Sequence, residues 1–315
     1  MPQPTSSDVH VDAILSNVSV AFMQEAYAFV AGRAFPTVNV LKQTDKYFTY
    51  SQADFFRDQV QRRADGTESA GTGYSLSTAT YNAQVYALHK DIGDQTRANA
   101  DIPLNMDMDA TRFLSQQMLI RQEVQWASDA FTTSVWDTDA TPSPLWDAAS
   151  STPIADVETA KNTVLTNTGY VPNTVIMSYK VFSALVDNSD IVDRIKYTSQ
   201  ESVTEELLAR LFGVDRVLVM AATYNTAAEG ATASYSLVGD KDVLVCYTPS
   251  APGLMVPSAG YNMVWTGVSA GLGTGAAVSR YRIEERKADR IEIEAAFDFK
   301  IVSTALGYFL SNCTS

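Results

Sequence analysis

The segment Gly267–Gly271 reads GVSAG and matches a pattern that places a nucleophilic serine on a sharp turn in many hydrolases. In such enzymes a serine in the place of Ser269 attacks an acyl carbon, and a histidine later in the chain accepts its proton. The chemistry needs a strand before the serine and a helix after it. Here LGTGAAVS is a poor start for a helix, and both histidines, His10 and His89, precede the serine. We therefore interpret the segment as a glycine-rich turn, with a soluble α/β hydrolase using Ser269 as an alternative.

The other residues that could support chemistry have unsuitable spacings. Gly271, Gly273 and Gly275 do not have the dinucleotide-binding spacing, and no lysine follows them to complete a phosphate loop. The carboxylates of NMDMDAT fit a helix cap better than a metal site. The two cysteines form no zinc spacing, and Cys246, in the apolar run DVLVCYTP, is expected to be a buried thiol. We predict no catalytic residue, no cofactor-binding residue and no metal ligand, and therefore no enzyme.

The composition indicates an acidic, globular protein of one large domain or two smaller ones. The chain has 315 residues, a hydrophobic fraction of 46%, a charged fraction of 19% and a net charge of -13. This charge argues against tight binding of nucleic acids, which requires a basic surface. No apolar run is long enough to span a membrane, and the N-terminal sequence has no secretion signal pattern.

The first hundred residues predict a helix followed by an extended hairpin. Apolar residues recur at spacings of three and four over 8–30, and Gly32 and Pro36 are expected to end this helix. Two β-prone segments, 46–58 and 81–93, flank a polar, glycine-rich connection. A connection of this length inside a compact domain tends to be functional.

A long helix is predicted over 107–136, with Asp107 or Asp109 as its N-cap. At 1.5 Å per residue it would extend roughly 40 Å. Thr138–Pro153 contains three prolines and is expected to connect two substructures. The residues expected on the main apolar face of the helix are Phe113, Ile120, Val124, Ala127, Phe131 and Val135, with Leu114 and Met118 beside it.

The chain then alternates between helices and strands, which predicts an α/β unit over 153–275. A helix is expected from Pro153 to Gly169, and a capping box, Ser202–Glu205, opens another that Gly213 stops. The strands expected in this unit are TVIMS, RVLVMAAT, DVLVCYTP and YNMVWTGV.

Near the C-terminus, RIEIEAAFDFKI alternates between apolar and polar residues over 290–301. This period of two predicts a long strand with one buried face, which we expect to return to the long helix. The overlapping charge run RIEERKADRIEIE is expected to coat a solvated face.

Three stretches of the sequence, together with the order of the predicted elements along the chain, resemble the major capsid proteins of tailed bacteriophages, which have the Hong Kong 97-type fold. They are YFTYSQADFFRD…GTGYSLSTATY, PNTVIMSYKVFSALVDNSDIVDRIKY and SVTEELLARLFGVDRVLV. The resemblance covers nearly the whole chain and implies an α+β fold with an N-terminal arm, an extended β-hairpin loop, a peripheral domain with a long spine helix, and an α/β axial domain. The implied segments are 1–45 for the arm, 46–100 for the extended loop, 101–152 and 276–315 for the peripheral domain, and 153–275 for the axial domain.

The resemblance implies that copies of the chain assemble as hexamers and pentamers into an icosahedral shell around double-stranded phage DNA. The chain would be part of the virion, assembled in the host cytoplasm without sequence-specific DNA binding and without a membrane. The expected partners are a separate scaffolding protein and a portal, and a decoration protein is left open. Gln59–Thr80 contains no lysine, so we do not expect the lysine–asparagine cross-link of some members.

Aromatic side chains on the arm and the hairpin are the expected subunit contacts, with packing inside the same chain as the alternative for each. They are Phe22, Phe29, Tyr47, Phe48, Phe55 and Phe56. Two other shell-like or phage functions stay open beside the hydrolase. One is an encapsulin-like bacterial compartment that holds enzymes, and the other is a tail or other structural protein of a phage.

Overall fold

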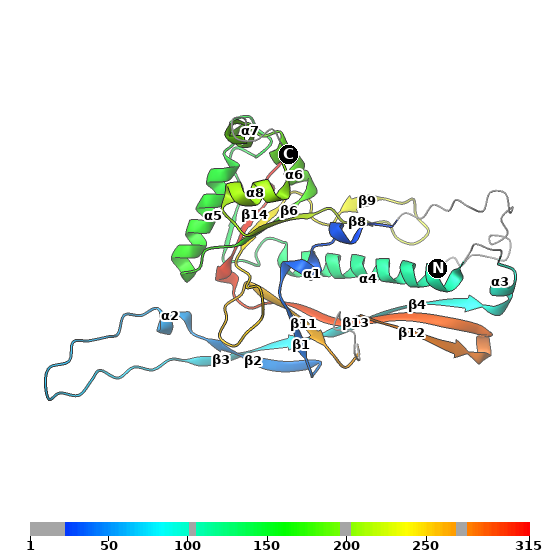
Figure 1. The fold of residues 1–315 in the computed structure, drawn as a ribbon, viewed down its shortest axis with the longest axis horizontal. Coiled ribbons are helices and arrows are strands. Elements are labelled where there is room, and N and C mark those ends of the chain that lie inside the picture. Colours follow the sequence, from blue (N-terminus) through cyan, green and yellow to red (C-terminus); the bar gives the residue numbers. More distant parts are fainter. Residues whose placement is uncertain (1–22, 101–104, 196–202, 269–275) are drawn as a thin grey trace.

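The computed structural model describes residues 23–100, 105–195, 203–268 and 276–315. Two five-stranded sheets form its two halves, and a hairpin projects from one of them (Figure 1). The peripheral sheet consists of β1 (Thr37–Val40), β4 (Gln84–Gly93), β11 (Gly260–Trp265), β12 (Ala276–Ile283) and β13 (Ala288–Ile301). The axial sheet consists of β5 (Thr138–Ala140), β6 (Thr174–Ser178), β7 (Arg216–Met220), β10 (Val243–Cys246) and β14 (Gly307–Leu310).

The long strand β13 is the centre of the peripheral sheet. It pairs antiparallel with β4 on one side and with β12 and β11 on the other, while β1 runs parallel to β11. The predicted period of two is confirmed, because Ile291, Ile293, Ala295, Phe297 and Phe299 are buried. These side chains belong to the main core, and β13 packs against the helix α4 (Met106–Ala130), as expected.

Helix α4 confirms the predicted long helix but corrects its ends. The side chain of Asn105, rather than Asp107 or Asp109, caps the N-terminus by accepting from Met108 N at 3.1 Å. At the other end, Trp136 Nε1 donates to Ala130 O at 2.8 Å, and the helix stops there instead of at residue 136.

The predicted apolar face of α4 is confirmed only in part, since Leu114, Met118 and Phe131 are buried but Phe113 is 44% exposed. The buried positions include small and polar residues, which an apolar pattern cannot identify. They are Ala110, Leu114, Gln116, Met118, Glu123, Trp126 and Ala130.

In the axial half, strands of the order β5-β14-β10-β6-β7 are covered by helices. The predicted stops at Gly169 and Gly213 are confirmed, and both residues have the positive φ that glycine tolerates. The N-cap of α8 is Thr204, whose side chain accepts from Leu207 N; Ser202 lies outside the described residues. The helices are α5 (Pro153–Thr168), α6 (Tyr179–Val186), α7 (Ser189–Ile195) and α8 (Glu205–Phe212).

Two strands lie in a different sheet from the one expected. YNMVWTGV contains β11, which pairs with β13 in the peripheral sheet rather than with the strands of the α/β unit. Conversely, β14 pairs with β10 in the axial sheet rather than completing the peripheral sheet. The four residues of β14 are all buried, so this strand fits the centre of a covered sheet. The chain therefore crosses between the two halves several times.

The N-terminal segment and the hairpin also have bounds that differ from those expected. Most of the helix predicted over 8–30 lies outside the described residues; the described part holds η1 (Ala26–Ala28) and α1 (Ala31–Ala34), which contains Gly32 instead of ending before it. The hairpin pairs β2 (Thr44–Tyr50) with β3 (Leu76–Asn82). The segment expected as its second arm, 81–93, mostly forms β4 of the peripheral sheet.

Short elements complete the fold. In the part of the chain that the structure describes, no helix is long and apolar enough to cross a membrane. The remaining elements are α2 (Gln52–Phe55), α3 (Asp94–Ala98), β8 (Thr223–Asn225), β9 (Tyr235–Leu237), η2 (Glu284–Arg286) and η3 (Thr304–Leu306).

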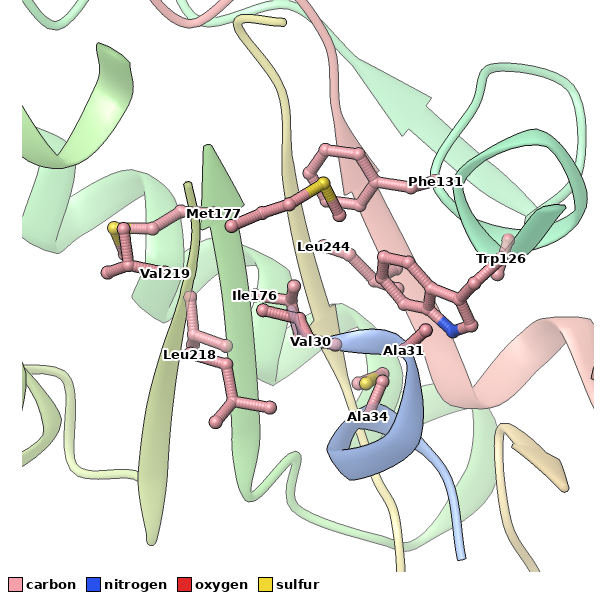
Figure 2. Packing of buried hydrophobic residues seen from close by; sticks show 14 of the residues in the cluster. Val30, Ala31, Ala34, Trp126, Phe131, Ile176, Met177, Leu218, Val219 and Leu244 are labelled. Carbon is pink, nitrogen blue, oxygen red and sulfur yellow. The ribbon is translucent and has the colours of Figure 1, made fainter. Parts of the chain in front are cut away.

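One continuous core joins the two halves through the segment that carries α1. Figure 2 shows Val30, Ala31 and Ala34 of this segment between Trp126 of α4 and the axial strands β6 and β10. Phe35, which follows, packs edge-on against Trp126. The segment that directly precedes β1 therefore fills the space between the two sheets.

Replacing Gly307 with alanine should destabilise the chain, because an added Cβ would lie 2.1 Å from a ring carbon of Trp136. The ring is buried and cannot move without losing its hydrogen bond to Ala130 O. We expect a loss of about 1–3 kcal/mol in the free energy of unfolding, measured by urea denaturation. Gly71→Ala, which meets nothing within 4 Å, is the control and should change little. Equal effects of both substitutions would contradict the packing described.

Candidate functional site

The hairpin β2–β3 and its connection, residues 44–82, form a projection that we call the finger (Figure 1). Side chains alternate between the two faces of a strand, so its two faces differ. On the inner face, Tyr47 and Tyr81 pack with Tyr261 and Met263 of β11. The base of the finger is therefore fixed to its own peripheral sheet through this second, smaller core.

The outer face of the finger is apolar and exposed. Phe48 is 66% exposed, and Leu76, directly opposite Tyr50 in the register, is 51% exposed. The rings of Tyr50, Phe55 and Tyr74 form a triangle with centroids 5.8–5.9 Å apart. We call these five residues the finger face. They hold one another in place but are not covered by the rest of the chain.

Two sets of polar contacts position the finger. Asp54 accepts hydrogen bonds from Ser75 Oγ at 2.6 Å and Ser75 N at 2.9 Å, which lower the pKa of Asp54 and close the loop behind the aromatic triangle. Gln52 Nε2 donates to Asn167 O at the end of α5. The ring of Phe56 lies against Gly169, 3.5 Å from where a Cβ would stand. The finger is thus an ordered element with an uncovered apolar surface.

The six aromatic residues expected as subunit contacts have different environments. Phe22 lies outside the described residues. Phe29 and Tyr47 pack inside their own chain, the alternative that the sequence left open, with Phe29 only 6% exposed. Phe48 and Phe55 lie together on the finger face, and Phe56 is exposed beside α5.

Sequence reasoning missed Tyr50, Tyr74 and Leu76 as members of the finger face. The alternation of side chains along a strand predicts one of them, because Tyr50 lies two residues from Phe48 and must share its face. The other two depend on the register of β3, which the sequence expectation placed too late in the chain.

The segment 24–36, which we call the strap, is bound to both halves of the molecule. Gln24 exchanges two hydrogen bonds with the backbone of Thr223, and Ala221 N donates to Ala28 O at 3.2 Å. Asn262 N of the peripheral sheet donates to Pro36 O at 3.0 Å. The strap thus connects the segment that follows β7 to the peripheral sheet.

A buried carboxylate of α4 holds the middle of the strap. Glu123 is 0% exposed and accepts from Val30 N at 2.9 and 3.0 Å and from Ala31 N at 2.8 Å. These amides begin the short helix α1 and would otherwise be buried without an acceptor. Burial raises the pKa of Glu123 to about 7, while the amide hydrogen bonds and the charge of Arg33 oppose this rise.

Ion pairs join the far end of β12 and β13 to α3 and the start of α4. Arg97 forms ion pairs with Asp289 and, at 2.7 Å, with Asp107. Arg280 binds Asp289 at 2.7 Å and Asp107 at 3.2 Å. Hydrogen bonds from Arg280 and Arg97 lower the pKa of Asp289. The charge run expected only to coat a solvated face therefore also connects separate elements.

Residues considered for catalysis are not brought together. Ser269 lies outside the described residues, and His89 lies on β4. Among the described residues, no group of three or more His, Cys, Asp and Glu side chains could hold a metal ion. Cys246 is buried as predicted, and burial raises the pKa of its thiol to about 12, so the thiol is not activated.

Comparisons of the sequence with known proteins point to phage capsids. A family model described as "Phage major capsid protein E" matches residues 130–258. The major capsid protein of the Burkholderia phage BcepMu is 21% identical over 310 residues, which is 96% of each chain.

Solved structures share the fold over nearly the whole chain. A phage-related protein of Bordetella bronchiseptica has a TM-score of 0.69 at 22% identity and covers 92% of this chain and 93% of its own. The capsid of the cyanophage P-SCSP1u has a TM-score of 0.62 at 11% identity, covering 96% and 93%. The SrpI encapsulin of Synechococcus elongatus has a TM-score of 0.59 at 11% identity, covering 96% and 95%.

These structures give the chain the α+β Hong Kong 97-type fold of viral shell subunits, in agreement with the expectation from sequence. With the capsid family match and the full-length capsid relative, the chain is a major capsid protein of a phage and a component of the virion.

Serine substitutions of Tyr47 and Phe48 should have different effects on stability, because Tyr47 lies on the covered face of the finger and Phe48 on the exposed face. Tyr47→Ser removes a ring from the smaller core and should lower the free energy of unfolding by about 2–4 kcal/mol. Phe48→Ser affects a ring that is already 66% exposed and should change the stability of the single chain by less than about 0.5 kcal/mol. Thermal or urea unfolding of unassembled chains measures both. A larger loss for Phe48→Ser would mean that the outer face is covered in the single chain.

Proposed function

We propose that copies of this chain build a closed icosahedral shell of hexamers and pentamers around double-stranded phage DNA, and that the finger face is a principal contact between copies. The observation that carries the proposal is the ordered, exposed apolar surface of Phe48, Tyr50, Phe55, Tyr74 and Leu76. A patch of this kind marks an interaction surface on a soluble protein.

The energetics favour assembly by repetition of one contact. Burying one aromatic side chain contributes roughly 1.5–3 kcal/mol, so a few rings give a modest contact between two subunits. Many such contacts in a closed lattice act together, and the whole shell is then stable. Phe56, exposed beside α5, extends the contact surface, and Phe22 stays a candidate on the arm.

The segments implied by the family likeness are proposed with changes suggested by the strand pairing. The arm, 1–45, would include the strap, and the axial domain would span 153–275. The extended loop, expected over 46–100, would end near Ala83, because β4 pairs with β13. The peripheral domain would comprise 84–152 and 276–315, so that it includes β4, with β11 added to its sheet and β14 given to the axial sheet.

In this function the chain works without catalysis and needs no cofactor. Its net charge of -13 suits a container for DNA, because an acidic wall does not bind the packaged polyanion tightly. Assembly in the host cytoplasm, a separate scaffolding protein and a portal are part of the proposal, and a decoration protein is left open.

A bacterial compartment shell is the second candidate, because the SrpI encapsulin shares the fold. The family match and the full-length relative both favour the phage capsid. The contents of purified particles separate the two: nuclease-protected DNA of genome length supports the capsid, whereas an enclosed enzyme without DNA supports the compartment.

Shortening the finger tests the proposal directly. A short glycine–serine turn can replace residues 51–75, because Tyr50 and Leu76 are paired at the end of the hairpin, and the change removes Phe55 and Tyr74 of the finger face. The variant should fold with unchanged unfolding free energy but should not form stable shells when expressed with its assembly partners. Electron microscopy and sedimentation measure the particles. Normal shells from the shortened chain would contradict the role of the finger, and Gly71→Ala, which keeps its length, should assemble normally.

Phe48→Ser also tests the finger face in assembly. Since its ring is exposed in the single chain, a loss of particles without a loss of chain stability would locate the defect in a contact between copies. We expect at least a tenfold decrease in assembled particles at equal concentrations of folded chain. Thr78→Ser, at the position opposite Phe48 in β3, is the matched control and should assemble normally. Full assembly of Phe48→Ser would contradict the proposed contact.

A further inference from the structure

The connection that the strap makes between the two halves of the chain depends on one buried ionisable group, the carboxyl group of Glu123. Val30, Ala31 and Ala34 lie between α4 and the axial strands, and their surroundings are apolar (Figure 2). The carboxyl group of Glu123 is the acceptor of the two amides that begin α1. No lysine or arginine bonds to this carboxyl group among the described residues.

A carboxylate without an ion pair in an apolar interior is costly, and it takes up a proton more readily than a solvated one. Three amide contacts favour the ionised form and oppose this effect. Burial outweighs them, which agrees with the raised pKa of Glu123. The state with the strap in place therefore binds a proton more tightly than a state in which water reaches Glu123.

The charged groups on neighbouring elements do not alter this balance. Arg33 of α1 favours the ionised form, but its guanidinium group is engaged with Tyr27 O at 2.8 Å and with Phe29 O. Arg216 of β7 donates to Ala34 O, at the end of α1 opposite to Glu123, and to the hydroxyl groups of Thr174 and Thr248. Glu205 of α8 accepts from the Tyr27 hydroxyl group and does not contact Glu123.

We propose that Glu123 makes the strap a proton-sensitive latch between the axial and peripheral halves, which tightens as the pH falls through neutrality and loosens as the pH rises. Opening exposes the carboxyl group to water, where it is ionised at neutral pH without cost. Closing at high pH requires burying the charge. The latch thus gives the subunit a pH-dependent connection between its halves, separate from the contacts between copies.

The sign of the effect follows from linkage. The folded-state pKa of this acid is raised, so the closed state carries the extra proton between about pH 4.5 and 7, and its stability relative to the open state falls as pH rises through this window. A carboxyl group that titrates near 4.5 when solvated and near 7 when buried makes opening about tenfold more frequent at pH 8.5 than at pH 6.

Hydrogen exchange of the unassembled full-length chain tests the latch. Protection factors of peptides covering 24–36, corrected for the intrinsic exchange rate at each pH, should fall about tenfold between pH 6 and pH 8.5. Glu123→Gln keeps the size of the side chain but cannot titrate, so its protection should be the same at both pH values, whatever its absolute level. Asp129→Asn, a half-buried carboxyl group on the same helix that does not contact the strap, should behave as the wild type does.

Three results would overturn the proposal. Wild-type protection that is constant between the two pH values would show that Glu123 does not control the strap. Protection that increases with pH would show that the amide hydrogen bonds outweigh burial. An unchanged pH dependence in Glu123→Gln would assign the effect to another group.

Discussion

The alternation of side chains along β2 is the constraint from which the proposed contact follows. Tyr47 must point inwards, because it fills the small core against β11, and the geometry of a strand then forces Phe48 outwards. The register with β3 places Leu76 on the same outer face as Tyr50. The same interactions that fix the base of the finger to its own chain therefore leave an apolar surface uncovered, and that surface needs a partner to be buried.

The finger projects from a body with one main core. A single core runs from the axial strands through the strap to α4 and the peripheral sheet. The chain crosses repeatedly between the two sheets, so neither half is independent of the other. A contact made at the finger is thus mechanically connected to the axial half, as a subunit in a closed lattice requires.

Local signals in the sequence predicted much of this fold. The period of two over β13, the glycine stops at Gly169 and Gly213, and the strand TVIMS are encoded within a few neighbouring residues, and all agree with the structure. The family likeness supplied the architecture and the function, which composition and periodicity alone could not give.

Features that depend on distant partners were missed. β11 and β14 have similar local patterns, and only long-range pairing decides which sheet each one joins. Glu123 is buried because amides almost a hundred residues away in the sequence need an acceptor, and a charged residue on a helix normally indicates a solvated face.

The most direct measurement of the central claim is cryo-electron microscopy of assembled particles at a resolution that shows side chains. The account predicts that the outer face of the finger, with Phe48, Tyr50, Phe55, Tyr74 and Leu76, is buried against another copy of the chain. Particles in which this face remains in solvent, or in which the finger folds back onto its own body, would contradict the account.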